Sequence, residues 1–418
     1  MKNFIQRNFP QYYPRLRKFA KSLEGFVRDT RIGLLGIPRT IVPLRKALAL
    51  PISKPIKAWE LEKSEGTYCI IDSPKAFTRK PPQFVNESAF PPSLIEAKEG
   101  IYPETGVLIL KGARLWSYYG ASVITNKDRL IQDFSKDVWG GARHSIYTRL
   151  HLPRARALKG RTLSLITPEA QKNYHHWMMD LLPRLRLVTE AGLRAEDFNQ
   201  ILIKDKGLPY QEESLIAAGI DSRRVIHVGD DDMYLCDELT VPSIRDDTTK
   251  IRPEDMHYVR KMFLNDKQVD APFRKLYITR KDAAFRHVLN EPELLFRLKT
   301  LNFEEVTMSG LSIKEQANLF SKASHIISPS SAALANLIFA PRQSKVFELL
   351  APRWIVPYTW LICENMGQNL QCIVGGHIQS ESYSHQIGIH DNIEIDSDQL
   401  ISILTTDQCN TELKTTSS

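Results

Sequence analysis

Alternating strand-like and helix-like segments constrain the fold of this chain more than any other feature of its sequence. The segments form two series, separated by a polar stretch around residues 246–250. Short apolar runs predict the strands, and longer segments between them predict the helices. Alternation of this kind is typical of α/β folds that are built on parallel sheets.

The first series follows the order strand, helix, strand, helix, strand. Its segments, with one further predicted strand at the end, are 162–167, 174–191, 200–204, 212–218, 224–228 and 233–241. Before this series, residues 66–150 hold short β-rich runs between Gly and Pro residues, such as Gly106-Val107-Leu108-Ile109-Leu110. These runs predict an antiparallel or mixed accessory sheet.

The second series has clearer helix-start signals. Its predicted strands are 276–279, 303–308, 325–328 and 345–349, and its helices are 294–300, 313–323 and 332–339. Asn290–Glu293 and Ser312–Glu315 match the capping-box pattern, and Pro253 lies early in another helix, where proline is tolerated. We therefore expect two Rossmann-like halves with ligand at the carboxyl ends of the parallel strands.

The length of 418 residues exceeds the usual single core and favours two domains. We expect a domain boundary near residues 245–270. The expected parts are a basic arm over 1–60, a first Rossmann-like domain with the β-rich segment over 61–250, a second Rossmann-like domain over 251–390 and an acidic tail over 391–418. The five cysteines are scattered without C-x-x-C spacing, which suggests neither a disulfide framework nor a zinc site.

Positive charge is concentrated in the arm. Residues 1–60 carry 13 Lys or Arg and 3 acids, a net charge of +10 in a chain whose total is +8, so the remainder is −2. The arm could lie on an anionic membrane surface, or it could be a solvated or partner-binding segment. No nucleic-acid-binding motif accompanies it. With no membrane-length apolar run and no secretory signal, we expect a cytoplasmic protein, with a peripheral position at the inner face of the membrane as the alternative.

His176 and Asp180 are four residues apart in a predicted helix, a spacing that places both side chains on one face. A carboxylate held beside an imidazole can act as general base for a hydroxyl nucleophile. The alternative is an exposed helix acid beside an ordinary interface histidine. A metal site that also uses His175 lacks a third ligand at short range.

Cations follow one predicted strand of the second series. Arg280, Lys281 and Arg286 suit phosphate, which guanidinium groups bind through two hydrogen bonds, although a solvated basic loop would have the same composition. The small residues Ser330, Ser331 and Ala332 then form a strand-to-helix turn whose free amides would attract an anion. Neither the G-x-G-x-x-G nor the G-x-x-x-x-G-K-[ST] fingerprint is present.

Two acidic features have alternative interpretations. Asp230-Asp231-Asp232 could clamp a metal or form a loop, and its position before another strand favours the loop. Glu348 ends a predicted strand beside the anion site, where it could accept hydrogen bonds from ribose hydroxyls or remain an exposed strand-end acid.

Taken together, three blocks of sequence resemble glycosyltransferase family 61 over roughly residues 160–350. These blocks are Asn173-Tyr174-His175-His176-Trp177 to Asp180 with Leu182-Pro183-Arg184-Leu185, Tyr277-Ile278-Thr279-Arg280 with Arg286 and Asn290-Glu291, and Ala332 to Ala340 with Phe347-Glu348-Leu349. The chain looks like the bacterial members described as capsular polysaccharide biosynthesis proteins. It departs from many relatives at Ser330-Ser331, where they have His-Gly, and at Ala333, where they have Gly.

The resemblance implies a GT-B fold of two facing Rossmann-like domains, with the acceptor on the first and the nucleotide sugar on the second. It also implies inverting transfer, typically from a UDP sugar to a hydroxyl of a glycan or glycolipid. Carried over by position, Asp180 looks like the base and Arg280 and Arg286 the phosphate-binding arginines, while Asn336 and Glu348 belong to the nucleotide side.

Fixed cations and helix-start amides can neutralise a departing diphosphate, so we expect no cofactor and no requirement for a divalent metal. Two other classes of protein remain possible: an inactive nucleotide-sugar-binding or scaffold protein of the same fold and, more remotely, a nucleic-acid binder that uses its basic arm.

Overall fold

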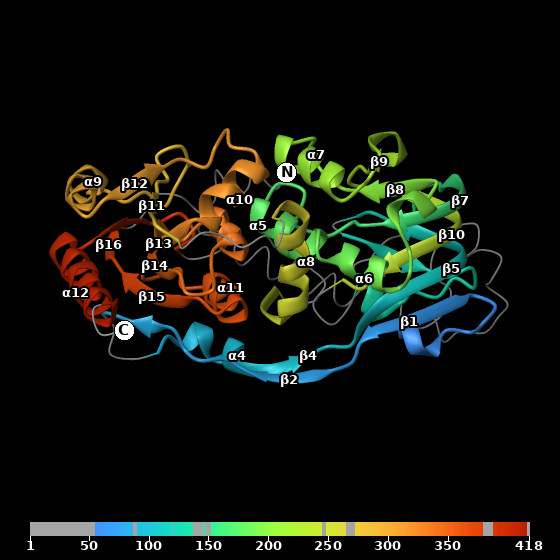
Figure 1. Cartoon of the computed structure of the whole chain (residues 1–418). Coiled ribbons are helices and arrows are strands. Elements are labelled where there is room, and N and C mark those ends of the chain that lie inside the picture. The colour runs from blue at the N-terminus through green and yellow to red at the C-terminus, as the bar shows by residue number, and fades with distance from the viewer. Residues whose placement is uncertain are drawn as a thin grey trace, which may run out of the picture. The chain divides into compact units, whose positions relative to one another are not determined.

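A computed structural model describes residues 55–415, apart from 87–89, 119, 137–143, 145, 147–151, 245–247, 265–271 and 379–387 (Figure 1). The chain divides into two compact units. The first unit comprises residues up to 74 with 103–247, and the second comprises 75–102 with everything from 248 onward. Of the basic arm expected over 1–60, residues 1–54 lie outside the described part of the chain.

The first unit contains one mixed sheet of seven strands in the order β1-β5-β10-β7-β8-β9, with β6 also paired to β5. These strands are β1 (Gly66–Asp72), β5 (Thr105–Trp116), β6 (Ser122–Ile124), β7 (Arg156–Ser164), β8 (Gln200–Ile203), β9 (Val225–His227) and β10 (Met233–Pro242). Strands β10, β7, β8 and β9 are parallel, whereas β1, β5 and β6 pair antiparallel. The antiparallel pairing predicted for the β-rich segment is therefore confirmed, but β1, β5 and β6 extend the main sheet of the first unit, and only residues 75–78 and 99–102 form a small sheet of their own.

The helix predicted over 174–191 forms in successive pieces, because one turn of it is a π-helix. The pieces are α5 (Tyr174–His176), the π turn η6 (Trp177–Leu181) and α6 (Arg184–Glu190). Pro183 has no amide hydrogen to continue the α-helical ladder, and the Leu182 amide donates to the Trp177 carbonyl five residues back at 3.1 Å. Helix α7 (Pro209–Ala217) follows β8 as predicted.

The second unit contains a parallel sheet of six strands in the order β12-β11-β13-β14-β15-β3. Its strands are β11 (Arg274–Ile278), β12 (Phe303–Val306), β13 (Ala323–Pro329), β14 (Lys345–Leu350), β15 (Asn369–Val374) and β3 (Gln83–Phe84). From β11 to β15 the order is that of a doubly wound fold, and it reverses between β11 and β13. Ligands of such folds bind at the carboxyl ends of the strands beside this reversal.

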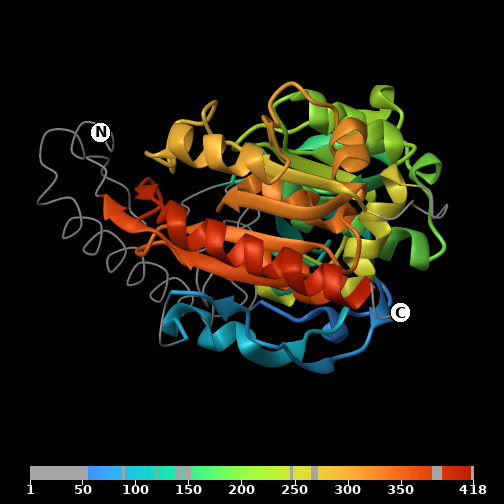
Figure 2. The same cartoon turned by 60° about the vertical axis from the view of Figure 1, so that its left-hand side comes forward.

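Helices cover the sheet of the second unit. They are α8 (Pro253–Phe263), α9 (Glu291–Thr300), α10 (Ile313–Ser321), the 3-10 helix η10 (Ala332–Phe339), α11 (Tyr358–Met366) and α12 (Ser397–Thr415). Leu294 and Leu298 of α9 and Leu400 and Leu404 of α12 share one buried cluster with the strand residue Phe347. Figure 2 shows α12 lying along the sheet.

Short elements complete the described chain. Strand β2 (Lys75–Thr78) pairs with β4 (Glu99–Tyr102), and β16 (Gly376–Ile378) pairs with β17 (Asn392–Glu394). The short helices are α4 (Ile95–Lys98), η2 (Ala58–Glu60), η3 (Pro92–Leu94), η4 (Gln132–Phe134), η7 (Ala195–Asp197), η8 (Ser222–Arg224) and η9 (Thr248–Lys250). Within the described residues, no helix is both long enough and apolar enough to cross a bilayer.

The capping-box prediction is confirmed at one helix and wrong at the other. At α10, Ser312 Oγ accepts from the Glu315 amide at 3.2 Å, and Glu315 Oε2 accepts from the Ser312 amide at 2.8 Å. At α9, Asn290 makes no side-chain cap and instead exchanges two hydrogen bonds with the backbone of Ile395. The Asn290 side chain is thus hydrogen-bonded to a residue 105 positions away in the sequence and does not cap α9.

Candidate active site

A histidine held between two carboxylates lies at the start of the interrupted helix in the first unit. Asn173 caps this helix by accepting from the amides of His175 and His176. His176 Nδ1 lies 2.7 Å from Asp180 Oδ2, and His176 Nε2 lies 3.0 Å from Glu169 Oε2. The expected pairing of His176 with Asp180 is therefore present, and Glu169 is an additional partner.

The two carboxylates determine the charge of His176. Burial alone would lower its pKa, but hydrogen bonds from the ring to Asp180 and Glu169, together with their charges, raise the pKa to about 9. The same hydrogen bond lowers the pKa of Glu169. His176 is consequently an imidazolium ion at neutral pH, so the groups able to accept a proton here are the carboxylates.

Asp180 is not the exposed helix acid of the alternative interpretation, because its side chain is 19% exposed and is bonded to His176. The side chain of Glu169 is 52% exposed, which leaves this carboxylate open to solvent. Sequence reasoning missed Glu169, since it precedes the helix and no periodicity links it to His176. The only sequence signal for Glu169 is that it lies a few residues before His175 and His176.

The acids considered as metal ligands have other partners. Asp230 pairs with Lys204 at 2.9 Å, Asp231 accepts from the Trp116 indole at 2.7 Å, and Asp232 accepts from the Gly229 amide at 2.8 Å. These contacts agree with the loop interpretation. Among the described residues, no group of three or more His, Cys, Asp or Glu side chains is arranged to hold a metal ion.

Two arginines lie beyond the carboxyl end of β11, beside the reversal of strand order in the second unit. Arg280 donates through Nε and Nη2 to the Phe285 carbonyl at 3.2 and 2.9 Å. Arg286 has a φ of +61° and, within the described chain, neither a hydrogen bond nor an ion pair; its buried Nε has no partner. Burial and the nearby charge of Arg280 lower the pKa of Arg286 to about 10. Lys281, the next residue after Arg280, is paired with Glu305 at 2.6 Å.

The turn between β13 and η10 contains a buried hydroxyl without a hydrogen-bond partner among the described residues. Ser331 occupies the N-cap position of η10, but its side chain makes no capping hydrogen bond, and its buried Oγ has no partner. Ala332 is the first helical residue, and the Ser330 amide donates to the Leu349 carbonyl at 3.0 Å. An unpaired buried hydroxyl and the first amides of a helix suit an oxyanion.

Glu348 lies inside the second unit, so its interpretation as an exposed strand-end acid was wrong. It is 2% exposed and accepts from Thr359 Oγ1 at 2.7 Å. Burial raises its pKa to about 7, against the opposing effects of hydrogen bonds from Thr359 and Ser330 and the charge of Arg286. Glu348 thereby lies near both Arg286 and Ser330, whereas its contact with a ribose stays a prediction.

Asn336 is hydrogen-bonded to a neighbouring helix. It is fully buried in η10, and its Nδ2 donates to Gln316 Oε1 of α10 at 2.6 Å. The structure therefore brings together Arg280, Arg286, Ser330, Ser331 and Glu348 in the second unit, as it does His176 and Asp180 in the first. Asn336 joins η10 to α10 through this bond, and its assignment to the nucleotide side stays a prediction.

Comparison with known proteins identifies the region that holds both groups. The family model described as Glycosyltransferase 61 matches residues 174–347, from the first residue of α5 to the middle of β14. The match includes every predicted site residue except Glu348, which follows its last residue. No curated protein matches the chain. Over residues 174–347, the chain is similar to the glycosyltransferase 61 family.

Proposed function

We propose that this protein is an inverting glycosyltransferase that moves a sugar from a nucleotide diphosphate, with UDP as the expected nucleotide, to a hydroxyl group of a glycan or glycolipid. The observation that carries the proposal is Arg286, a half-buried cation beside Arg280 at the reversal of strand order. It stacks on the Phe285 ring and lies near Glu348, but it makes no hydrogen bond or ion pair among the described residues, and its buried Nε has no hydrogen-bond partner. A buried charge is costly unless an anion compensates it. A diphosphate would supply that anion.

The reaction uses one group of residues from each unit. Asp180 takes the proton from the acceptor hydroxyl while its oxygen attacks the anomeric carbon, and the bond from that carbon to the diphosphate oxygen breaks on the opposite face. The contact of 2.7 Å between His176 Nδ1 and Asp180 Oδ2 holds the carboxylate in place. Arg280, Arg286, the Ser331 hydroxyl and the first amides of η10 take up the negative charge of the diphosphate, which is the electrostatic contribution that usually matters most.

The GT-B architecture belongs to the proposal as well. The doubly wound sheet of the second unit supports it as the nucleotide-binding domain, since its reversal point carries the arginines. The first unit contributes the carboxylates and would bind the acceptor. Because the cations are built into the protein, we propose that transfer needs no divalent metal, and activity should survive excess EDTA. Loss of activity in EDTA with recovery in Mn²⁺ would contradict this part.

Calorimetric titration with UDP tests the diphosphate site. We expect Arg286→Gln to weaken binding about tenfold to a hundredfold, because charge-assisted hydrogen bonds to the phosphates are lost. Lys281→Gln is the matched control, since it removes a cation from the same loop that is already paired with Glu305. Equal affinity in wild type and Arg286→Gln, with melting temperatures unchanged, would contradict the proposed site.

A second measurement separates transfer from simple binding. Incubation with UDP sugars and a glycan acceptor should release UDP and give a product whose anomeric configuration is opposite to that of the donor. Nucleotide binding without transfer for any donor would instead favour the inactive binding protein.

A further inference from the structure

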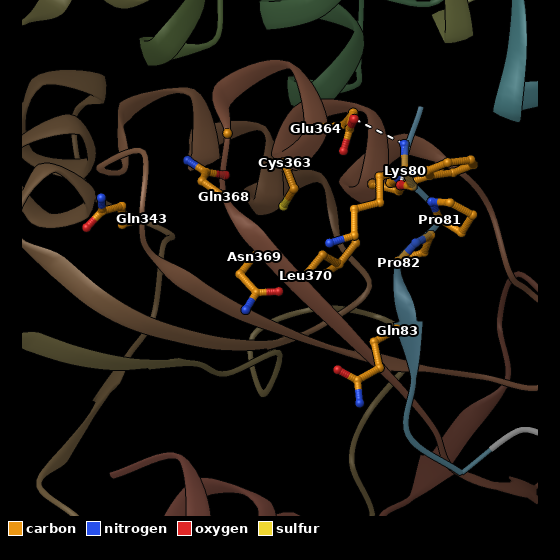
Figure 3. Close-up of a pocket in the computed structure, with 12 residues that line it drawn as sticks. Lys80, Pro81, Pro82, Gln83, Gln343, Cys363, Glu364, Gln368, Asn369 and Leu370 are labelled. Carbon is orange, nitrogen blue, oxygen red and sulfur yellow. Dashed lines mark hydrogen bonds between the residues drawn. The ribbon is translucent and has the colours of Figure 1, made fainter. Parts of the chain in front are cut away.

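A polar pocket of about 490 Å³ lies in the second unit, and Figure 3 shows the residues that line it. Gln83 and Asn369, which line it, are the first residues of β3 and β15, and Gln343 precedes β14 by two residues. All three mark the amino ends of parallel strands. Arg280 and Ser330 follow carboxyl ends, so the pocket is not part of the diphosphate site.

Fixed contacts build the walls of this amino-edge pocket. One wall is the segment Lys80–Pro82, and the other is α11 with the residues that follow it. The Trp360 indole donates to the Lys80 carbonyl at 2.8 Å, and Glu364 Oε1 accepts from the Lys80 amide at 3.1 Å. Two backbone groups of Lys80 are thus bound to α11, which fixes the position of this wall relative to the helix.

Carboxamide side chains dominate the hydrogen-bonding groups that face this space. The side chains of Gln83, Gln343 and Asn369 make no hydrogen bond within the described part of the chain. Gln368 donates through Nε2 to the Leu337 carbonyl at 2.6 Å, and its buried Oε1 has no partner. Each carboxamide can both donate and accept, so together they offer several hydrogen bonds of each kind.

The charge and shape of the pocket narrow the class of ligand. Among the described residues that line the pocket, only Lys80 and Glu364 are of charged types, and their opposite charges cancel. Figure 3 shows the Lys80 side chain extending from the segment toward Asn369. Pro81, Pro82 and Leu370 add small apolar surfaces. Hydroxyl groups on a carbohydrate match this set, because each both donates and accepts, while C–H faces lie between them.

We propose that the amino-edge pocket binds a short segment of uncharged glycan. Its volume falls within the range of about 300–1,000 Å³ that is usual for ligand pockets. The inference goes beyond the proposed transfer reaction, because it uses neither Asp180 nor Arg286. It can therefore hold or fail whatever the outcome of the nucleotide titrations.

The test is ¹⁹F NMR on the full chain labelled with 5-fluorotryptophan. Trp360 is the only described tryptophan that lines the pocket, and its signal is assigned as the one missing from Trp360→Phe. Maltose, cellobiose, lactose and N,N′-diacetylchitobiose are titrated to millimolar concentration in separate samples. We expect at least one of them to shift the Trp360 signal saturably while the Trp177 signal stays in place.

Variants locate the binding. Gln83→Leu combined with Asn369→Leu, both at exposed positions, should weaken the disaccharide at least about tenfold, because two hydrogen-bonding amides are lost. Asn318→Leu removes an exposed amide of the same unit outside the pocket and should change nothing. The proposal is overturned if no disaccharide shifts Trp360, if affinity is unchanged in the double variant although its melting temperature is normal, or if phosphate or glucuronate shifts the signal as strongly as any neutral sugar.

Discussion

At the scale of single residues, the cluster in the first unit shows how far spacing can predict a site. The interval of four residues was enough to predict that His176 and Asp180 meet, because both lie on one helix. Glu169 was not predictable, since its approach to the ring depends on how the segment before the helix folds back. Glu169 adds to the effect of Asp180 in raising the pKa of the histidine, and this contribution is visible only in the structure.

Removal of the Asp180 charge should stop transfer and leave UDP binding almost unchanged, because the proposed base acts on the acceptor. We expect Asp180→Asn to lower the transfer rate by about 10²- to 10⁴-fold. Glu169→Gln, the matched control, also removes one carboxylate from His176 and should cost much less. Turnover at the wild-type rate in Asp180→Asn would show that another group is the base.

The raised pKa of His176 predicts a dependence of stability on pH. Because the pKa is about 9 in the folded protein against 6.5 in the unfolded chain, the stabilisation is complete below pH 6.5 and is lost as the pH rises through 9. The difference in free energy of unfolding between wild type and His176→Gln should therefore shrink by about 3 kcal/mol or less over this window. Urea unfolding at several pH values measures it. A constant difference would mean that the carboxylates do not hold a proton on the ring.

At the scale of elements, local sequence predicted most helices and strands but not how they end. Ser312 caps its helix because its partner Glu315 is only three residues away, whereas the Asn290 side chain is hydrogen-bonded to the backbone of Ile395. Likewise, β3 has only two residues and owes its existence to β15, so no local pattern could indicate it. Contacts between segments that are distant in the sequence determine the cap of α9 and the strand β3. Local sequence patterns do not predict such contacts.

Helix α6 is fixed by a buried arginine, and its removal should destabilise the first unit. The fully buried guanidinium of Arg184 donates to the carbonyls of Ser164, Ile166, Pro242 and Ser243, which follow or end strands β7 and β10. Arg184→Met would leave these acceptors without a donor and should lower the free energy of unfolding by about 3 kcal/mol or more. The control Arg194→Met, at a side chain 73% exposed, should change it by under about 0.5 kcal/mol. A similarly small effect at Arg184 would contradict this role.

At the scale of the whole molecule, each of the two units is built from two separate stretches of sequence, whereas the expected domains were continuous. Residues 75–102 precede most of the first unit in sequence but belong to the second, where β3 extends the parallel sheet. The expected acidic tail from 391 onward likewise contributes β17 and α12, whose Leu400 and Leu404 are buried. The boundary after residue 247 falls within the predicted stretch, because a switch from one series of strands to the next is visible locally.

The distribution of charge leads to a prediction about the full chain. Residues 1–60 carry a net charge of +10 and the rest carries −2, so attraction to an anionic bilayer would depend on the arm. Deletion of residues 1–57 should reduce sedimentation with vesicles that contain phosphatidylserine, while UDP affinity stays unchanged because both site groups lie after residue 168. High salt should reduce sedimentation of the intact chain in the same way, since it screens exposed charges. Neutral phosphatidylcholine vesicles are the control. Equal sedimentation of the intact and shortened chains would show that the arm does not bind the membrane and would favour a protein partner for it.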